Sequence, residues 1–390
     1  MEKKYLIINL GSTSKRYSLY LQGKSVLDLS LQKKGSGYSA SAKHHDVAEE
    51  IEVPKSEFSN SVKFVKDSLL EFGIIEDIKE ISAIGIRIVA PGNYFLKNKV
   101  IDANYVKELE SAEENAPLHI APVLSELKQI KKILSGIKVV GVSDSSFHHP
   151  LPEKTKVYAI PKSDAKKYGV YRQGYHGLSV ASSVRYLRSS GLLKKKTIVC
   201  HLGGGCSIVA LNNGRSVDTS MGFTPVEGVF GSTRSGDIDA GAMIHLGKKL
   251  KLSLSGLESY LNNKSGLSSL AGNGDMRIVL EKAKKGNVDS KQAIESFVYK
   301  VRKYIGAYAV ALGGLDCIVF TGAMGVGSQY IRSKICEDLG CLGVSIDPSK
   351  NRKTDDKEGF VQSGKSKVKV ILIKPREMQE IYLSMKNILS

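Results

Sequence analysis

Four polar side chains occupy places in the sequence where an enzyme would present reacting groups. Arg87 interrupts an apolar run, and an arginine in a buried strand needs an anionic partner. Asp144 directly follows an apolar strand-like run, and His176 lies between two glycines. Arg234 lies in a glycine-framed segment that also carries two aspartates. Each residue alone is more often structural, but together they suit a reaction between two anions.

Phosphoryl transfer to a carboxylic acid is a reaction of this kind. The carboxylate and the phosphate repel each other, so cationic groups must neutralise both and magnesium must bridge the donor phosphates. A guanidinium binds a carboxylate through two parallel hydrogen bonds and stays charged, which suits Arg87 and Arg234. A carboxylate just beyond a strand, such as Asp144, is a usual metal-orienting group in α/β folds. Such a reaction requires no serine, cysteine or histidine nucleophile.

The elements that must position these groups include a strand–glycine–strand pattern that occurs twice. The first copy runs from Tyr5 to Leu21 around a turn at Gly11 to Ser14, and the second from Thr197 to Leu211 around Gly203–Gly205. A third apolar run, Cys317 to Phe320, also leads into a glycine-containing turn. Backbone N–H groups at tight glycine turns form anion-binding concavities. The repetition predicts a duplicated architecture with a phosphate-facing loop in each half, although the pattern alone also fits ordinary hairpins.

Helices are predicted between the strands. Helical spacing of apolar residues appears at Val62 to Phe72, Ser290 to Leu312 and Glu377 to Ile388. Alternating strands and helices indicate the α/β class, and a chain of 390 residues is long enough for two domains. The polar segment Asn351 to Lys367 is expected to be a surface excursion before a strand at Val368 to Ile373.

A P-loop pattern at Gly359 to Ser366 is interpreted as accidental. Its letters match GxxxxGK[ST], but a charged loop precedes it and a strand follows. The P-loop needs a strand before it and a helix after it, so that the helix N-terminus faces the phosphate. We therefore expect the phosphate to be held elsewhere.

Composition narrows the classes of function. The net charge is +18, but the basic residues are scattered and no aromatic residues interleave with them, which favours a solvated basic surface over a nucleic-acid site. No apolar run approaches the ~20 residues of a membrane span, and the start of the chain does not read as a secretory signal, so a cytoplasmic protein without a membrane partner is predicted. Five cysteines at irregular spacing, with no CxxC pair, suggest neither a zinc site nor disulfides.

Over nearly its whole length the sequence resembles the acetate kinase family. The amino-terminal motif and eight further segments follow in the family's order. These segments are Asn9-x-Gly11-Ser12-Thr13-Ser14, Ala116-Pro117-Leu118-His119, Asp144-Ser-Ser-Phe147-His148, Cys200-His-Leu-Gly203, Asp218-Thr-Ser-Met-Gly-Phe-Thr-Pro225-x-Glu-Gly228, Thr233-Arg-x-Gly-Asp-Ile-Asp239, Lys264-Ser-Gly-Leu267, Asp275-Met-Arg277 and Tyr304-Ile-Gly-Ala-Tyr308.

The resemblance implies a fold and an activity. The fold is that of actin, sugar kinases and heat-shock chaperones, with two similar ribonuclease H-like α/β domains around a central cleft, in a homodimer. Domain boundaries are expected at residues 1–150, joined by the C-terminal helix 377–390, and at residues 151–376, which would hold the nucleotide. The activity implied is reversible transfer of a phosphoryl group from ATP to acetate, with Mg²⁺, or Mn²⁺ in its place, giving acetyl phosphate and ADP.

The resemblance also implies roles for individual residues. Catalysis would involve Asp144, Arg87, Arg234, His176 and His119. The phosphate path would be lined by Asn9, Ser12, Ser14, Arg16, His201, Gly203, Gly204 and Gly205. The nucleotide would contact Asp275, Met276, Arg277, Gly322, Ala323, Met324 and Gly325. The acyl group would lie among Val89, Leu118, Tyr175 and Pro225, and the metal near Asn9 and Glu377.

Several positions depart from the family pattern, mainly on the donor side. Arg16 replaces a lysine, Gly204 replaces the phosphate-loop asparagine, and the adenine loop reads Gly322-Ala-Met-Gly-Val-Gly327. Glu377 can serve as the metal-side glutamate only with a shift of one residue. Family histidines are also replaced, by Ile86, Ala90 and Val180. The drifted adenine loop raises a pyrophosphate-dependent enzyme as an alternative, and propionate is an alternative acceptor. The lost histidines and the +18 charge raise a catalytically weak paralogue that binds anions through its basic surface.

Overall fold

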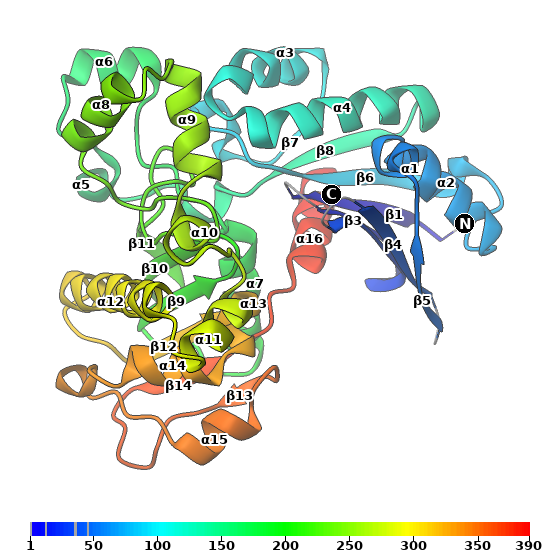
Figure 1. Ribbon diagram of the computed structural model, residues 1–390. Helices are drawn as coiled ribbons and strands as arrows, with labels where there is room; N and C mark the ends of the chain where they lie inside the picture. The colour runs from blue at the N-terminus through cyan, green and yellow to red at the C-terminus, as the bar shows by residue number, and fades with distance from the viewer. Residues whose placement is uncertain (1, 12–13, 35–36, 45–46) are drawn as a thin grey trace. The chain divides into compact units, whose positions relative to one another are not determined.

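The described residues form two compact units. The computed structural model describes residues 2–11, 14–34, 37–44 and 47–390. Unit 1 comprises Met1–Ser146 together with Glu377–Ser390, and unit 2 comprises Phe147–Arg376 (Figure 1). Within the described residues, no helix is both long and apolar enough to span a bilayer.

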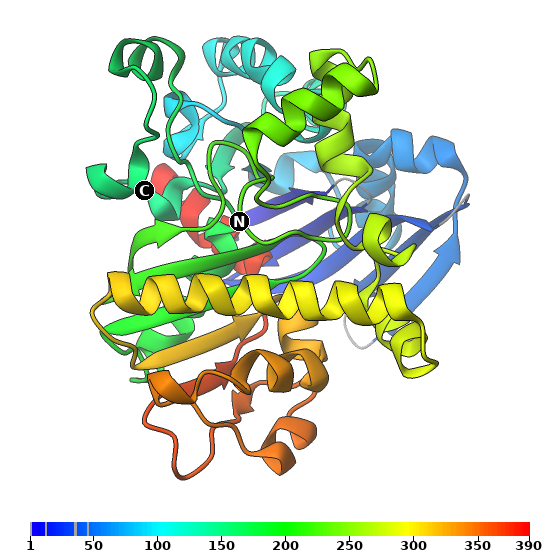
Figure 2. The same ribbon diagram turned by 60° about the vertical axis from the view of Figure 1, so that its left-hand side comes forward.

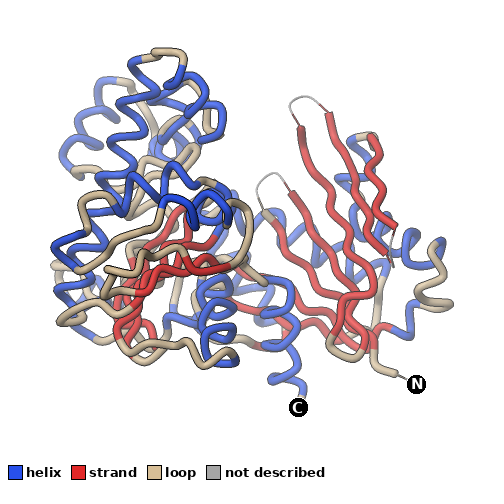
Figure 3. The backbone as a smooth tube through the Cα atoms, turned by 90° about the horizontal axis from the view of Figure 1, so that it is seen from below, coloured by secondary structure: helices blue, strands red, loops and turns tan. Residues whose placement is uncertain are grey.

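Unit 1 is built on an eight-stranded sheet with the order β5-β4-β3-β2-β1-β6-β8-β7. The strands from β1 to β5 are antiparallel neighbours (Figure 3), whereas β6 and β8 run parallel to β1. The elements of this unit are β1 (Lys4–Leu10), β2 (Ser14–Leu21), β3 (Lys24–Lys34), β4 (Gly37–His44), β5 (Val47–Glu52), α1 (Lys55–Ser59), α2 (Ser61–Glu71), β6 (Ile81–Ile88), β7 (Lys99–Val100), α3 (Ala103–Ala112), α4 (Pro117–Ile133), β8 (Lys138–Ser143) and α16 (Glu377–Leu389).

The alternation of side chains along β1 divides the helices between the two faces of this sheet. Leu6, Ile8 and Leu10 belong to the core that α2 and α4 cover. Tyr5 and Ile7 point to the other face, which α16 covers, as Figure 1 shows. The carboxyl-terminal helix is thereby fixed to the strand that opens the chain.

A buried ion pair ties β2 to α4. Lys15 Nζ lies 3.1 Å from Glu126 Oε2, and the two side chains are 10% and 0% exposed. Ser61 accepts from the same ammonium at 2.7 Å, and Tyr17 donates to Glu126 Oε1 at 2.6 Å. Burial and the adjacent Glu126 raise the pKa of Tyr17, so the phenol remains a donor. This network holds the strand that follows the first glycine turn.

Unit 2 is built on a six-stranded sheet with the order β11-β10-β9-β12-β14-β13. The long helix α12 runs along one face of this sheet (Figure 2), and α7 packs on the other. The elements of this unit are α5 (Glu153–Lys156), α6 (Lys162–Tyr168), α7 (Gly177–Ser189), β9 (Lys196–Leu202), β10 (Cys206–Asn212), β11 (Arg215–Thr219), α8 (Ala240–Lys249), α9 (Leu254–Asn263), α10 (Gly266–Ala271), α11 (Met276–Lys284), α12 (Val288–Ala311), β12 (Cys317–Thr321), α13 (Gly322–Gly327), α14 (Gln329–Cys336), α15 (Pro348–Lys353), β13 (Gly359–Phe360) and β14 (Lys369–Leu372).

The two sheets repeat one arrangement of strands. In unit 1 the order β3-β2-β1-β6-β8 consists of an antiparallel meander followed by two strands parallel to β1. In unit 2 the order β11-β10-β9-β12-β14 has the same directions. The α/β class with two similar domains, predicted from the repeated hairpins, is confirmed.

Local predictions mostly hold, with two differences. The helices predicted at 62–72, 290–312 and 377–388 are present as α2, α12 and α16. The P-loop pattern is followed by the strand β14 and not by a helix, as its rejection requires. The run at 317–320 is the strand β12, but it leads directly into the short helix α13 and not into a turn. The expected excursion at 351–367 is partly wrong, since α15 and β13 overlap it and Val361 is fully buried in the core.

Candidate active site

In unit 1, the polar residues predicted from four separate segments form one hydrogen-bonded cluster. Arg87 Nη2 donates to Asp144 Oδ2 at 2.8 Å, and Arg87 Nη1 donates to Asn9 Oδ1 at 3.2 Å. Asn9 Nδ2 in turn donates to Glu377 Oε2 at 2.9 Å. These residues come from the carboxyl ends of β1, β6 and β8 and from the first turn of α16. Parallel strands bring their carboxyl ends to one edge of a sheet, which is where α/β folds place their ligands.

Burial makes the charges of this cluster consequential. The side chain of Arg87 is 15% exposed and that of Asp144 only 1%. Burial disfavours the charged guanidinium, but the carboxylates of Asp144 and Glu377 outweigh it, so the pKa of Arg87 is raised. The arginine therefore carries a fixed positive charge at a partly enclosed place, as binding of an anion requires.

The same cluster suits magnesium. Its oxygen ligands are carboxylates, from Asp144 and Glu377, and the amide of Asn9. Mg²⁺ is usually held by one or two carboxylates together with substrate phosphates and water, and less often by an all-protein cage. The described part of the chain holds no group of three or more His, Cys, Asp or Glu side chains that could hold a metal ion. Glu377 reaches Asn9 despite the shift of one residue noted in the sequence.

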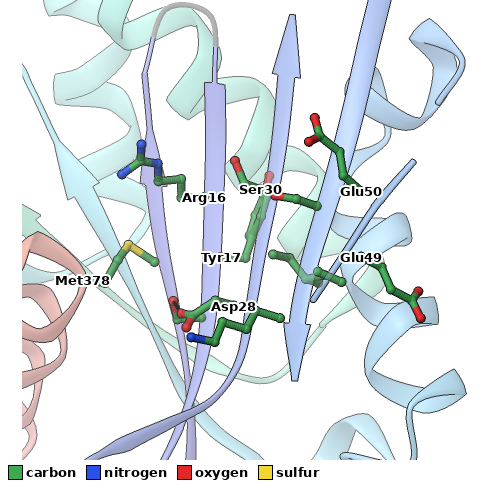
Figure 4. A pocket seen from close by; sticks show the side chains of 12 residues that line it. Arg16, Tyr17, Asp28, Ser30, Glu49, Glu50 and Met378 are labelled. Atoms are coloured by element: carbon green, nitrogen blue, oxygen red, sulfur yellow. Dashed lines mark hydrogen bonds between the residues drawn. The ribbon is translucent and has the colours of Figure 1, made fainter. Parts of the chain in front are cut away.

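The first glycine turn leads directly from this cluster to Arg16. Gly11 N donates to the Ser14 carbonyl at 2.7 Å, which closes the turn, whereas the predicted phosphate ligand Ser12 lies outside the described residues. Arg16 pairs with Asn9 across β1 and β2. It borders a hollow of about 480 Å³ on the polar face of the antiparallel strands, together with Met378 (Figure 4).

Three further predicted residues of unit 1 lie just after β6 or in α4. Val89 directly follows β6 and is 7% exposed. Leu118 and His119 lie in the first turn of α4, and Leu118 is 38% exposed. The acyl pocket that contains Val89 and Leu118 therefore stays a prediction.

In unit 2, a second cluster forms around the glycine turn between β9 and β10. The rings of His176 and His201 have centroids 4.1 Å apart. His201 Nδ1 lies 2.8 Å from Ser179 Oγ, and His176 Nδ1 lies 3.2 Å from Ser207 Oγ. These hydroxyls fix the orientation of both imidazoles.

Arg234 reaches the same turn from the loop that follows β11. A Cβ built on Gly205 would lie 3.0 Å from Arg234 Nη1 and 3.3 Å from the ring of His176. Arginine and histidine thus converge on the backbone of the glycine turn, where their N–H groups and those of the turn can face a phosphoryl group. His176 has a φ of 59° at the start of α7, so its flanking glycines present it from an unusual backbone conformation.

A hollow of about 850 Å³ extends from this glycine turn. Gly203 and Gly204 line one part of it, and Asp275 and Met276, where α11 begins, line another. Ligand pockets usually measure ~300–1,000 Å³. Of the residues predicted to contact a nucleotide, those that line this hollow are Asp275, Met276, Arg277, Ala323 and Met324, whereas Gly322 and Gly325 do not.

The sequence analysis missed further residues of this hollow. Gln329, Tyr330, Asp355 and Asp356 also line it. In the sequence, a polar segment before a strand indicates only a surface loop, so nothing marked residues 355–356 as part of this hollow. In the sequence Tyr330 is an ordinary aromatic residue, and only the packing of α14 against α13 brings it to the hollow.

A buried arginine, also unpredicted, holds the wall of the hollow together. Arg332 is 0% exposed and donates to the carbonyls of Gly325 and Val326 at 3.1 and 2.5 Å. It also donates to Asn351 Oδ1 at 2.8 Å and to Asp355 Oδ1 at 3.1 Å. Burial lowers its pKa, and the interaction with Asp355 opposes that shift. One side chain thereby joins α13, α14, α15 and the loop after it.

Tyr175 and Pro225, the other predicted acyl-pocket residues, lie close together in unit 2. Tyr175 is 1% exposed, and its hydroxyl donates to the Phe223 carbonyl at 2.6 Å. That contact joins the tyrosine to the turn that contains Pro225. In each unit, some of the predicted site residues therefore form a cluster: Asn9, Arg87, Asp144 and Glu377 in unit 1, and His176, His201 and Arg234 around the glycine turn in unit 2.

Comparisons with known proteins place the whole chain in one family. The model of the acetokinase family matches residues 4–382. An acetate kinase of Pseudothermotoga lettingae is 38% identical over 388 residues, which cover 96% of this chain and 94% of that protein. The crystal structure of Porphyromonas gingivalis acetate kinase has a TM-score of 0.87 at 33% identity and covers 100% of both chains. A propionate kinase from Francisella tularensis has a TM-score of 0.90 at 30% identity and covers 99% of both.

Proposed function

Because the chain belongs to the acetokinase family, we propose that it transfers the γ-phosphoryl group of ATP to acetate, reversibly and with Mg²⁺. A carboxylate oxygen of acetate forms a bond to the γ-phosphorus, and the bond from that phosphorus to the β,γ-bridging oxygen breaks. The products are acetyl phosphate and ADP. No covalent enzyme intermediate is needed, so the protein contributes position and charge.

The observation that carries the proposal is the hollow of unit 2. The glycine turn at Gly203 and Gly204, beside His176 and Arg234, lines this hollow together with Met276, Met324 and Tyr330 and with charged side chains such as Arg277 and Lys284. Anion-binding backbone and an apolar, aromatic wall in one hollow fit a phosphate chain joined to a base. Pyrophosphate would occupy only a part of this hollow of about 850 Å³. The hollow therefore supports a nucleoside triphosphate as the donor.

The charged residues supply electrostatic stabilisation of the transferred group. Arg234 and His176 lie at the glycine turn and would bind the oxygens of the γ-phosphoryl group. Arg87, whose raised pKa keeps it cationic, would bind the acetate carboxylate and offset its repulsion by the phosphate. His119 is proposed to assist nearby. These donors act most strongly where water is excluded and the dielectric is low.

A magnesium ion held in this cluster would supply neutralisation of the charge on the donor phosphates. Asp144 and Glu377 would hold or orient the ion, with Asn9 between them, because their oxygens already form one connected cluster. Arg87 would keep the Asp144 carboxylate in place for this task, since the two groups are 2.8 Å apart.

Three further points complete the proposal. The acceptor is acetate, with propionate as the alternative, because one extra methylene is worth only ~1–3 kcal/mol in a hydrophobic pocket.

Residues 151–376 hold the nucleotide, and residues 1–150 with 377–390 form the other actin-like domain. The enzyme is proposed to act in the cytoplasm as a homodimer, for which light scattering should give about twice the 42.4 kDa of one chain.

Trapping of the acyl phosphate tests the reaction. The purified chain is incubated with acetate, Mg²⁺ and hydroxylamine, in parallel with ATP, with pyrophosphate and with no donor, and acetohydroxamate is measured. The proposal expects product with ATP and none with pyrophosphate. Product with pyrophosphate alone would replace the donor. No product with either donor, together with salt-dependent retardation of DNA, would support the anion-binding paralogue. A parallel reaction with propionate measures acceptor preference.

A further inference from the structure

The loop that carries Pro225 and Arg234 has no regular secondary structure of its own. It connects β11, which ends at Thr219, to α8, which begins at Ala240. Loops longer than ~12–15 residues without secondary structure are uncommon and are often functional. Two side chains whose positions matter for the reaction therefore depend on contacts that the rest of unit 2 makes with this loop.

A first anchor fixes the part of the loop around Pro225. The Tyr158 hydroxyl accepts from Phe223 N at 2.9 Å and donates to Glu227 Oε2 at 2.5 Å. Arg172 Nη2 donates to the other oxygen, Glu227 Oε1, at 2.5 Å. The carboxylate packs so tightly over Gly222 that a Cβ there would lie 1.6 Å from Glu227 Oε2. The anchor thus closes the turn on both sides of Pro225.

The first anchor is joined to the segment that leads into His176. Tyr175 donates its hydroxyl proton to the Phe223 carbonyl at 2.6 Å. The backbone N–H groups of Gln173 and Gly174 both donate to the Gly222 carbonyl, at 3.0 and 3.2 Å. Displacement of this turn would move Tyr175 and Pro225 together, so the anchor acts on the acid side of the site.

A second anchor fixes the part of the loop around Arg234. Asp237 Oδ1 accepts from Gly228 N at 2.8 Å, and Asp237 Oδ2 accepts from the Tyr304 hydroxyl of α12 at 2.8 Å. Asp237 N also donates to the Gly228 carbonyl at 2.9 Å. These bonds close residues 228–237 into a ring that contains Arg234 and attach it to the longest helix of the unit.

Both anchors have the same chemistry, a tyrosine that donates to a carboxylate. Burial, followed by the adjacent Glu227, raises the pKa of Tyr158, and burial, followed by Asp237, raises that of Tyr304. Both phenols therefore stay protonated at neutral pH. Hydrogen bonds to charged groups are stronger than those between neutral groups.

We propose that these anchors position different parts of the reaction: Tyr158, with Glu227 and Arg172, sets the acid pocket, and Tyr304, with Asp237, sets Arg234. This inference rests on the proposed phosphoryl transfer to a short carboxylic acid. The first anchor governs the KM for the acid and the preference between acetate and propionate. The second governs kcat. Neither tyrosine is assigned a contact with substrate, so both are positioning residues.

The same minimal change at each anchor tests the division. Tyr158→Phe and Tyr304→Phe remove one hydroxyl each, and kcat, the KM values for acetate and ATP, the propionate-to-acetate ratio and the melting temperature are measured. Tyr158→Phe is expected to raise the KM for acetate about tenfold and to shift the ratio, with kcat within about threefold of wild type. Tyr304→Phe is expected to lower kcat about tenfold, with the KM for acetate within about threefold.

Two more variants keep the test decisive. Tyr299→Phe on the same helix as Tyr304 changes a side chain that is 65% exposed, and it should alter none of these quantities. Glu227→Gln keeps the size of the side chain but loses the charge that both Tyr158 and Arg172 bind, and it should shift the KM for acetate in the same direction as Tyr158→Phe.

The outcomes separate the inference from the function it depends on. If Tyr158→Phe and Tyr304→Phe change kcat and KM in equal proportion, or if neither differs from Tyr299→Phe, the division of roles is overturned. A KM for ATP that rises equally in both would indicate a general loosening of unit 2 and would also overturn it. A wild-type chain that forms no acyl phosphate would refute the proposed function, and the inference with it.

Discussion

The ion pair between Arg87 and Asp144 gives the strongest single prediction about unit 1. The guanidinium and the carboxylate are 2.8 Å apart, and the Asp144 side chain is 1% exposed. Replacing Arg87 with methionine would leave a buried carboxylate without its cation. Loss of one partner of a buried ion pair typically costs about 3–5 kcal/mol, because the remaining charge stays desolvated. Arg87→Met should therefore reduce the free energy of unfolding by an amount in this range.

Catalysis should suffer separately from stability. Removal of one preorganised donor from a charged transition state typically lowers kcat by about 10²–10³. The reduction of kcat should persist at temperatures where the variant is fully folded, because the lost guanidinium is proposed to bind the acid. Hydroxamate formation with ATP, measured beside the circular dichroism signal, distinguishes an inactive folded protein from an unfolded one.

A double-mutant cycle isolates the pair. Arg87→Met, Asp144→Asn and the double variant are unfolded in urea, with the exposed Arg16→Met as a control for loss of positive charge. The double variant should be more stable than the sum of the single changes predicts, with a coupling of about 1.5–3 kcal/mol. Arg16→Met should change the free energy of unfolding by no more than about 0.5 kcal/mol. Additivity of the first two changes within about 0.5 kcal/mol would refute the reasoning.

Three other changes test separate features. Lys15→Met should lower the free energy of unfolding by about 3–5 kcal/mol, and adding Glu126→Leu should restore only part of it, because Tyr17 and Ser61 then lose their acceptor; a double variant as unstable as the single one in urea would contradict this. Gly205→Ala should cut turnover at least about tenfold, because its Cβ would lie 3.0 Å from the nearest cationic side chain, whereas Gly204→Ala, at 3.7 Å from its nearest neighbour, should keep most activity in the hydroxamate assay. Burial, and after it the nearby Asp28, raises the pKa of Tyr20 to about 12. The contribution of this shift to the free energy of unfolding is therefore complete below pH 10 and is lost as the pH rises through 12. Tyr20→Phe should make the free energy of unfolding less dependent on pH in that window, and an unchanged slope would contradict this.

The repeated framework could be predicted because local patterns determine it. Glycine turns between apolar runs are short-range signals, and each hairpin lies where those signals put it. Asn213 and Gly214 have φ values of 52° and 73°, the positive values that the two central residues of a type I′ hairpin turn require. The helices α2, α12 and α16 follow from apolar spacing alone.

The connections within the site could not be predicted in the same way. Glu227 stands in a recognisable segment, yet nothing in its neighbours along the chain indicates that Tyr158 and Arg172 meet it. In the sequence Arg332 is one basic residue among many on a helix, and only the fold shows that three elements surround it. Such partners are separated by tens of residues, and their meeting depends on tertiary packing.

The contact between Asn9 and Glu377 shows both the reach and the limit of sequence reasoning. The chain positions differ by 368 residues, and the segment around Glu377 is shifted by one from the family pattern. Resemblance alone left this glutamate in doubt. The geometry places it at the cluster because α16 packs on β1 and begins beside the end of that strand.

Phosphorus NMR of the reverse reaction tests the central claim most directly. The wild-type chain is mixed with acetyl phosphate, ADP and Mg²⁺, and the spectrum is followed with time. The account predicts that the acetyl phosphate resonance falls while the β-phosphorus resonance of ATP appears at the same rate. Release of inorganic phosphate without ATP, or no change in the presence of ADP and Mg²⁺, would contradict it.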